Sequence, residues 1–218
     1  MKPRRSNQNS QAMTLIEVLV VIASLVVLAA MLLPALAASK RKSSRIGCVN
    51  YLHQIGLAYK TWEGDNGDKY PMGVSATLGG SMEMAATGNV VQTFQVMSNQ
   101  LSTAKVLHCP ADMEHFETNS FAGLSSSNIS YFVSVDMTND IYPQIILDGD
   151  DNFAIGGIPV KSGLLQLSTN APISWTTARH HFLGNIGLAD GSAQELNNSG
   201  LTNLLRQTDV ATNRLAIP

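Results

Sequence analysis

Two histidines and an aspartate near the carboxy-terminal end of the chain are the residues best suited to metal binding or proton transfer. The stretch HHFLGNIGLADG begins with His180 and His181 and ends with Asp190 and Gly191. Imidazole and carboxylate groups bind transition metals and act as general acids and bases. No third ligand or nucleophile stands beside them at a characteristic spacing. We therefore favour a structural role, in which Asp190 and Gly191 form a turn and a histidine bonds to its backbone.

A second group of polar residues offers oxygen ligands. The stretch LDGDDN supplies three carboxylates and one amide, from Asp148, Asp150, Asp151 and Asn152. Oxygen atoms of this kind are the ligands that calcium prefers. The same residue types are common in turns, because their side chains bond to nearby backbone groups. The sequence leaves a calcium site and a solvated turn as the two alternatives.

The chain has two cysteines, Cys48 and Cys109. An even, low count is compatible with one disulfide if the domain is exported to an oxidising compartment. It is equally compatible with two separate buried thiols. Composition alone does not choose between these alternatives.

Near the amino terminus, a long apolar stretch contains a single carboxylate. Residues 18–39 carry no charge, and as a helix they would be roughly 33 Å long, enough to cross a hydrocarbon core of about 30 Å. Glu17 stands at the entry to this stretch. An ionised carboxylate near the bilayer interior costs at least about 2.5–3.5 kcal/mol, so Glu17 indicates a function and a partner. Pro34, which lacks an amide N–H, is expected to weaken the helix locally.

The residues around Glu17, AMTLIEVL, resemble the cleavage and methylation site of type IV prepilins and of type II secretion pseudopilins. The resemblance implies that residues 1–12 are a basic leader, removed by a prepilin peptidase between Ala12 and Met13. Ala12 replaces the glycine that is usual in the family. The resemblance also implies N-methylation of Met13, a pairing of Glu17 with the amino terminus during assembly, and a helix-weakening proline at Pro34.

The resemblance extends to the rest of the chain. His180, nine intervening residues and then Asp190-Gly191 resemble the H-X9-DG element of prepilin-like proteins from planctomycete and verrucomicrobial bacteria. Cys48 and Cys109 fall where that pattern often has cysteines.

Two other interpretations of the apolar stretch explain less. The residues Ala35, Leu36 and Ala37 have the small-x-small form of a signal-peptidase site. The apolar run, however, is longer than the roughly 7–15 residues that are typical of the core of a signal peptide. A plain transmembrane anchor would leave Glu17 unexplained.

Composition narrows the function classes. The chain has 218 residues, a formal net charge of -2 and 14% charged residues. That length suits one membrane segment and one modest soluble domain. The charge balance gives no electrostatic support for nucleic-acid binding.

The elements that must position these residues follow from periodicity. Apolar residues recur at spacings of three and four as far as Trp62, which predicts one long helix over residues 14–62. Gly64 and the following turn formers end it. We expect a loop over residues 72–88, a short helix over 89–101 and a strand that ends near Cys109.

The carboxy-terminal part of the chain reads mainly as antiparallel sheet. Alternating stretches predict strands in ISYFVSVDM, YPQIILDGD, GLLQLS and APISWTTA, and a hairpin that turns at Asp190-Gly191. A final helix is expected over residues 200–213. The predicted fold is α+β: a long amino-terminal helix, with a membrane half and an amphipathic half, packed on a mainly antiparallel sheet domain.

We therefore expect a leader over residues 1–12, a transmembrane helix over 13–39, an amphipathic continuation over 40–64 and a pilin-like domain over 65–218 that carries the element 180–191. The resemblance implies a filament subunit rather than an enzyme, in the inner membrane with its domain periplasmic or extracellular. Its implied partners are the prepilin peptidase and N-methyltransferase, the assembly platform, sibling subunits and membrane lipid. No cofactor is required, with calcium as the one candidate. The alternatives are a membrane-anchored metal-binding protein or enzyme using His180, His181 and Asp190, and a minor adhesin displayed on a pilus.

Overall fold

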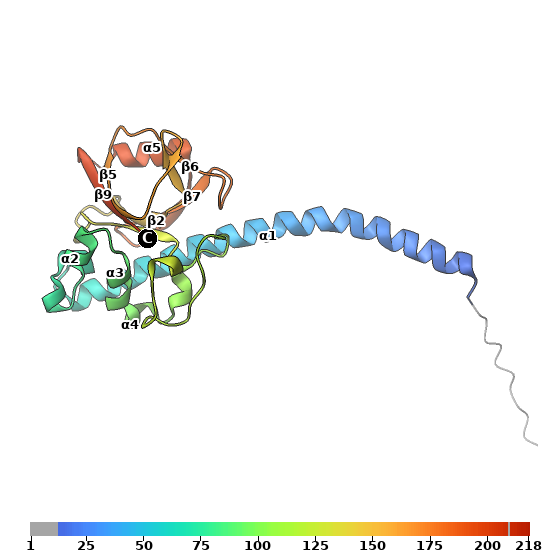
Figure 1. Ribbon diagram of the computed structural model, residues 1–218, viewed down its shortest axis with the longest axis horizontal. Helices are drawn as coiled ribbons and strands as arrows, with labels where there is room; N and C mark the ends of the chain where they lie inside the picture. Colours follow the sequence, from blue (N-terminus) through green and yellow to red (C-terminus); the bar gives the residue numbers. More distant parts are fainter. Residues whose placement is uncertain (1–12, 209) are drawn as a thin grey trace, which may run out of the picture. The chain divides into compact units, whose positions relative to one another are not determined.

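The computed structural model describes residues 13–208 and 210–218, so the predicted leader and Ala12 of the predicted cleavage site lie outside the described residues. The fold is α+β, with one long amino-terminal helix and a mainly antiparallel sheet domain (Figure 1). Helix α1 spans Leu15–Asp65, close to the predicted range of 14–62. Gly67 and Asp68, both with positive φ angles, follow its end, as the turn-forming sequence predicts.

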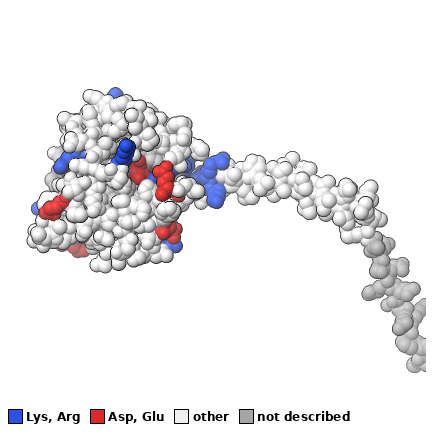
Figure 2. All heavy atoms as spheres, in the orientation of Figure 1, with Lys and Arg blue, Asp and Glu red and all other residues white. Residues whose placement is uncertain are grey.

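The chain divides into two compact units, with residues 43–218 forming the larger one. The second half of α1 belongs to this larger unit. The first half, as far as Lys42, is exposed at every described position and carries no charged side chain between Glu17 and Lys40 (Figure 2). It is long and apolar enough to cross a membrane, by length and composition.

Six strands form the main sheet, and every neighbouring pair in it is antiparallel. Their order across the sheet is β5-β9-β1-β2-β7-β8. The strands are β1 Tyr131–Ser134, β2 Ile146–Asp150, β5 Gly163–Ser168, β7 Leu183–Leu188, β8 Ala193–Asn197 and β9 Thr212–Ile217. A second sheet has the order β4-β3-β6, with β3 Phe153–Ile155, β4 Ile158–Pro159 and β6 Ile173–Trp175.

The main sheet separates two hydrophobic cores, because successive side chains of a strand point to opposite faces. Tyr131 and Val133 of β1 belong to the core that contains the second half of α1. Phe132, between them, belongs to the core that contains helix α5 (Asn198–Arg206) and the small sheet. Figure 1 shows α1 and α5 on opposite sides of the strands.

Short helices fill the region between α1 and β1, where the sequence predicted a loop over residues 72–88, a short helix over 89–101 and a strand before Cys109. The 3₁₀ helices are η1 Pro71–Gly73, η2 Ala76–Leu78, η3 Ala104–Leu107 and η4 Ser126–Asn128, and the α-helices are α2 Met82–Ala86, α3 Val91–Val96 and α4 Ser98–Leu101. The predicted loop over 72–88 is therefore wrong, as is the strand before Cys109. A polar cap favours the helix before Cys109: the Thr103 hydroxyl accepts a hydrogen bond from the Lys105 amide at the start of η3.

The end of the chain also differs from the prediction. Helix α5 begins at Asn198, where the Asn197 side chain caps it by accepting from the Gly200 amide at 2.8 Å, and it ends at Arg206 rather than Asn213. Residues 212–217 instead form β9, which pairs with both β5 and β1. Tertiary pairing with these distant strands outweighs the local helical pattern.

Candidate functional site

The first turn of α1 holds the residues implied in processing and assembly. Thr14 precedes the helix, and its amide donates to Glu17 Oε2 at 2.7 Å, while the Glu17 amide donates to Thr14 Oγ1 at 3.4 Å. This reciprocal arrangement is a capping box, in which each side chain satisfies an amide that the helix leaves unpaired. The spacing T-x-x-E was the signal for it in the sequence, and our interpretation of Glu17 did not use it. Met13, next to this turn, is exposed.

Pro34 lies inside α1, which continues through it. Its missing amide N–H removes one backbone hydrogen bond from the helix at that point. The predicted helix-weakening residue is therefore within the exposed, apolar half of α1.

Cys48 of α1 and Cys109, which follows η3, form a disulfide. Both are completely buried. The bridge therefore connects the second half of α1 to the segment that leads into β1. Of the two alternatives that the sequence left open, the structure contains the bridge.

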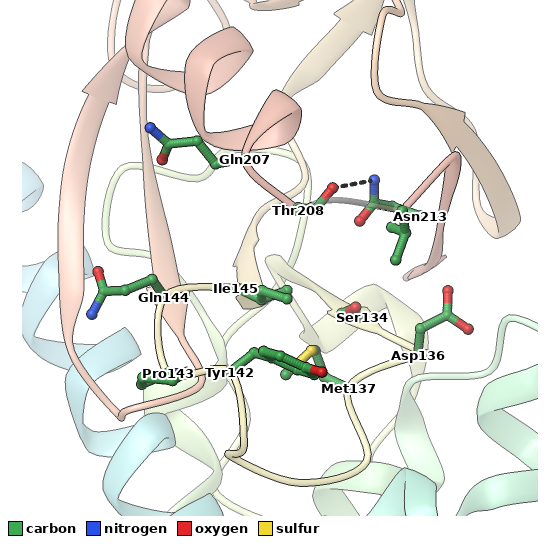
Figure 3. A pocket seen from close by; sticks show the side chains of 11 residues that line it. Ser134, Asp136, Met137, Tyr142, Pro143, Gln144, Ile145, Gln207, Thr208 and Asn213 are labelled. Atoms are coloured by element: carbon green, nitrogen blue, oxygen red, sulfur yellow. Dashed lines mark hydrogen bonds between the residues drawn. The ribbon is translucent and has the colours of Figure 1, made fainter.

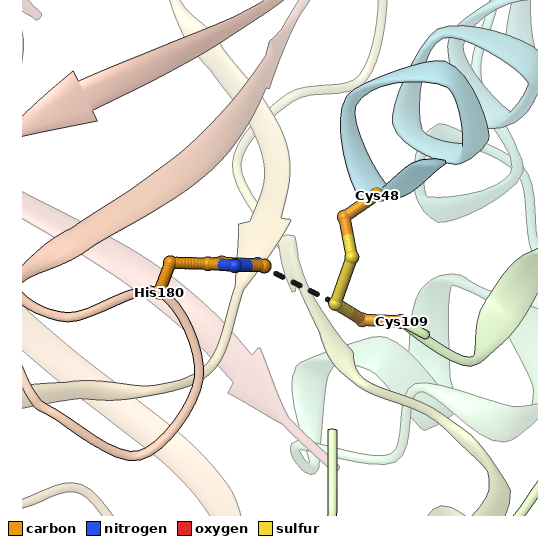
Figure 4. Close-up of side chains that lie close together, drawn as sticks. All are labelled: Cys48, Cys109 and His180. Carbon is orange, nitrogen blue, oxygen red and sulfur yellow. Dashed lines mark hydrogen bonds between the residues drawn. A yellow bond between two sulfur atoms is a disulfide. The ribbon is translucent and has the colours of Figure 1, made fainter. Parts of the chain in front are cut away.

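His180 lies beside this disulfide, with its ring directed at the bridge (Figure 4). Its Nε2 is 3.4 Å from Cys109 Sγ and 3.5 Å from Asp150 Oδ2. The side chain is almost completely buried. Burial, together with the nearby positive charge of Arg179, lowers the pKa of His180 to about 4, so the imidazole is neutral at neutral pH.

These contacts do not build a catalytic triad. In a triad, the histidine uses one ring nitrogen for the nucleophile and the other for the carboxylate. Here the same atom, Nε2, faces both Cys109 and Asp150, and the sulfur is already bonded to Cys48.

The turn at Asp190 and Gly191 contacts α1 at a different point. Gly191 has a φ of 82°, and its carbonyl accepts a hydrogen bond from His53 Nδ1 at 2.9 Å. A Cβ on Gly56 would lie 2.8 Å from the Gly191 backbone, so only glycine permits this close approach of helix and turn. The Asp190 side chain closes the turn by accepting from the Ser192 amide at 2.8 Å. A histidine does brace the turn, but it is His53 and not His180.

His180 and Asp190 stand at opposite ends of β7, which at about 3.3 Å per residue is roughly 20 Å long. His181, adjacent to His180, points away from the core and is exposed. The described residues therefore do not bring His180, His181 and Asp190 together as a metal or catalytic set. The element 180–191 instead fixes both ends of β7 against α1, through the disulfide at one end and through His53 and Gly56 at the other.

The four calcium candidates lie in a strand and its end rather than in one loop. Asp148 and Asp150 belong to β2 and are fully buried. Asp150 Oδ2 accepts from the Asn185 amide at 2.8 Å and from its side chain at 2.9 Å. Asp151 forms an ion pair with Arg179, and Asn152 is buried directly before β3. The carboxylates of Asp148, Asp150 and Asp151 form no common metal-ligand group among the described residues.

Burial sets the protonation of the two strand carboxyls. Neither oxygen of Asp148 has a hydrogen-bond partner among the described residues, and burial, with the neighbouring Asp150 charge, raises the pKa of Asp148 well above its usual range. Burial also raises the pKa of Asp150 to about 7, against the opposing charge of Arg179. Asp148 is therefore a neutral acid in the core.

Arg179 is the centre of an ion-pair network that the sequence did not suggest. Its guanidinium donates to Asp112 Oδ2 at 2.6 Å and pairs with Asp151, and its Nη1 donates to the Ser130 carbonyl at 2.7 Å. His115 Nδ1 donates to the same Asp112 oxygen at 2.8 Å. Asp112, His115 and Asp151 have metal-ligand spacing, but Arg179 already supplies the positive charge that their carboxylates need. Arg179 is distant in sequence from all three of these partners, so the network gives no local signal.

A pocket of about 550 Å³ opens beside the loop before β2 and the end of α5 (Figure 3). Met137, Tyr142 and Ile145 give it an apolar wall, and Thr208 and Asn213 give it a hydrogen-bonded polar edge. None of the functional-site residues that the sequence predicted lines this pocket.

Comparisons of the chain with known protein families, with curated proteins and with solved structures find no match.

Proposed function

We propose that this chain is a pilin-like structural subunit of a type IV pilus or of a type II secretion pseudopilus. The observation that carries the proposal is the division of α1. Residues 13–43 are exposed throughout, whereas the second half of the same helix contributes buried side chains from Cys48 to Glu63. A subunit that is first held in a membrane and later packed in a filament core needs such a helix.

The exposed half requires a partner outside the chain. Large apolar side chains such as Leu15, Ile22 and Leu33 are all more than half exposed. An apolar surface of this extent marks a site that lipid or protein covers. In the proposed life cycle, lipid covers it first, and the corresponding helices of sibling subunits cover it after assembly.

Glu17 has two tasks in this proposal. Within its own chain it closes the capping box with Thr14. Cleavage between Ala12 and Met13 would create an ammonium group on Met13, and Glu17 of a neighbouring subunit would pair with the ammonium of an incoming one. In apolar surroundings such an ion pair avoids the cost of leaving the carboxylate unpaired. It would fix the register of each new subunit.

The domain would lie outside the cytoplasm and coat the filament. The proposed partners are the prepilin peptidase and N-methyltransferase, the inner-membrane assembly platform, sibling subunits and lipid. The role is structural, and no cofactor takes part in it. The buried disulfide suits an oxidising compartment.

Intact-mass measurement on protein from membranes tests processing. We expect a chain that begins at Met13 and carries one methyl group on its amino terminus. A Met13→Ala variant leaves Glu17 and the apolar run in place. It shows whether methylation requires methionine at the new amino terminus or only requires that the leader has been cleaved. An uncleaved chain, or one that begins near Lys40, contradicts the proposal.

Variants of Glu17 separate its two tasks. Glu17→Gln retains the capping box, because glutamine also accepts from the amide at that position, but it removes the charge. Glu17→Ala removes both. If the charge sets the register, both variants are inserted and cleaved but neither enters filaments. If Glu17→Gln enters filaments normally, the charge of Glu17 does not set the register of the subunits. The capping box would then be the one role of Glu17 that the proposal retains.

A further inference from the structure

Three side chains that are distant in sequence meet in the core between α1 and the main sheet. Cys48 comes from α1, Cys109 from the segment after η3 and His180 from the loop before β7. Their sulfur and nitrogen atoms all lie within 4.8 Å of one another. We propose that this group binds Zn²⁺ when the disulfide is reduced, so that the protein has a disulfide in an oxidising compartment and a zinc site in a reducing one. The proposal is independent of the proposed function.

The spacing of the ligand atoms suits zinc. In tetrahedral sites the Zn–S and Zn–N distances are about 2.3 and 2.0–2.1 Å, which places neighbouring ligand atoms roughly 3.5–3.8 Å apart. Cys109 Sγ and His180 Nε2 are already 3.4 Å apart. The two sulfurs, which are bonded to each other in the disulfide, must separate to reach this spacing, and rotation of the cysteine side chains about their Cα–Cβ bonds moves them apart.

The chemistry of the ligands selects a soft or borderline metal. Two thiolates and one imidazole suit zinc and not calcium or magnesium, which take oxygen ligands. His180 is placed to bind, because its Nε2 faces the sulfur at 3.4 Å. The Asp150 carboxylate lies beside the group, 3.5 Å from Nε2, and is held by two hydrogen bonds from Asn185.

The charges and electrons balance. A dithiol or phosphine reductant supplies two electrons, the S–S bond breaks, and each sulfur takes up a proton to give a thiol. Binding of Zn²⁺ displaces these two protons. The two thiolates then neutralise the metal, which is necessary in a site where Cys48, Cys109 and His180 are all at most 2% exposed.

The consequence is that α1 stays attached to the domain in both redox states. The disulfide attaches it covalently, and the metal would do so through the same two sulfurs and His180.

Cobalt binding by the full chain in detergent tests the proposal. The protein is reduced with a phosphine without oxygen, titrated with Co²⁺ and then with Zn²⁺. We expect one Co²⁺ per chain, with the visible bands of tetrahedral cobalt and thiolate charge-transfer absorption, and displacement by Zn²⁺. His180→Ala should weaken binding by at least about tenfold, because even supporting residues of metal sites contribute roughly 10–100-fold. His181→Ala, the neighbouring exposed histidine, is the matched control and should bind as the natural protein does.

Three results would overturn the proposal. The first is a reduced natural protein that binds Co²⁺ no more tightly than a Cys48→Ser variant. The second is a His180→Ala variant that binds as tightly as His181→Ala. The third is equal binding by the oxidised protein. Far-ultraviolet circular dichroism of each variant, recorded before reduction, shows whether a loss of binding reflects unfolding, and the first result needs no histidine variant at all.

Discussion

The first half of helix α1, residues 15–42, contributes no side chain to either core, whereas the second half contributes eight buried residues between Cys48 and Glu63. Both halves have the same backbone conformation. In the first half, apolar residues surround the helix axis, so no single face is distinguished. In the second half they recur on one face, which packs against the sheet.

The difference shows that the two halves depend on different partners. The second half is held within the chain, by the Cys48–Cys109 bridge, by the close contact of Gly56 with Gly191, and by the ion pair of Arg45 with Glu195, in which Nε donates to Oε2 at 2.6 Å. The first half has its capping box and its backbone hydrogen bonds, and its apolar surface requires lipid or other chains. Substitutions in the two halves should therefore affect different measurements.

Loss of the disulfide should give the largest effect on the domain. The bridge joins residues 61 positions apart, and closing a loop of this length in the unfolded chain is worth on the order of 4 kcal/mol. We expect a Cys48→Ala, Cys109→Ala double variant to lose about that much free energy of unfolding, measured by denaturant unfolding of the full chain in detergent. Helicity of the first half should not change. A loss under about 1 kcal/mol would show that the bridge constrains the unfolded chain little.

The same substitution in each half of α1 tests the comparison directly. Leu52 is completely buried, and Leu52→Ala should reduce the free energy of unfolding of the domain by about 2–5 kcal/mol through loss of burial and a remaining cavity. Leu25 is 57% exposed, and Leu25→Ala should leave domain unfolding unchanged while it weakens filament assembly. Equal effects of the two variants on domain unfolding would show that the halves are not independent.

The sequence predicted those parts of the fold whose signals are local. The periodicity of α1, the alternation in β1 and the hairpin at Asp190-Gly191 each lie within one stretch of chain, and the structure has them. Strand β9 could not be recognised, because its position in the sheet depends on β1 and β5, many residues earlier. Its first two residues, Thr212 and Asn213, were predicted as the end of a helix, and its remaining four residues were assigned to no element.

The same distinction, between local signals and tertiary packing, applies to the candidate site. His180 and both cysteines were recognised from their patterns, but their meeting in the core is a property of tertiary packing. Arg179 and Asp112 were not recognised at all, because an ion pair between residues 67 positions apart leaves no spacing to detect. The capping box of Thr14 and Glu17 is a different case. Its local signal was present, and the membrane interpretation of Glu17 took precedence over it.

Acidification should distinguish the domain from the exposed helix half. Burial alone would raise the pKa of Asp112, but the hydrogen bond from His115, the charge of Arg179 and the Ser130 hydroxyl together hold that pKa well below its usual range. A carboxyl whose pKa is lower in the folded state stabilises the protein above its unfolded pKa of about 3.9 and loses this contribution as the pH falls further. We expect this contribution of Asp112, roughly 1–3 kcal/mol, to be lost between about pH 5 and about pH 2.

An Asp112→Asn variant should be less stable at neutral pH and should lack this acid-side slope. Glu117, which forms an exposed ion pair with Lys105, provides the matched control, since Glu117→Gln should keep the slope. Denaturant unfolding followed across the pH range measures all three proteins. A slope that persists in Asp112→Asn would assign the acid sensitivity to another carboxyl.

The smallest effect is expected at the first turn of α1. Thr14→Ala removes the hydroxyl that accepts from the Glu17 amide, and loss of such a cap costs about 1 kcal/mol, equivalent to roughly fivefold faster amide exchange. The faster exchange should be confined to the amides of residues 15–18 of the chain in a lipid-like environment, while the unfolding midpoint of the domain stays unchanged. Glu17→Gln, which keeps the reciprocal bond, should exchange as the natural protein does. Because the cap is local and no described side chain of residues 15–42 belongs to either core, a shift of the domain midpoint in Thr14→Ala would contradict the separation of the two halves.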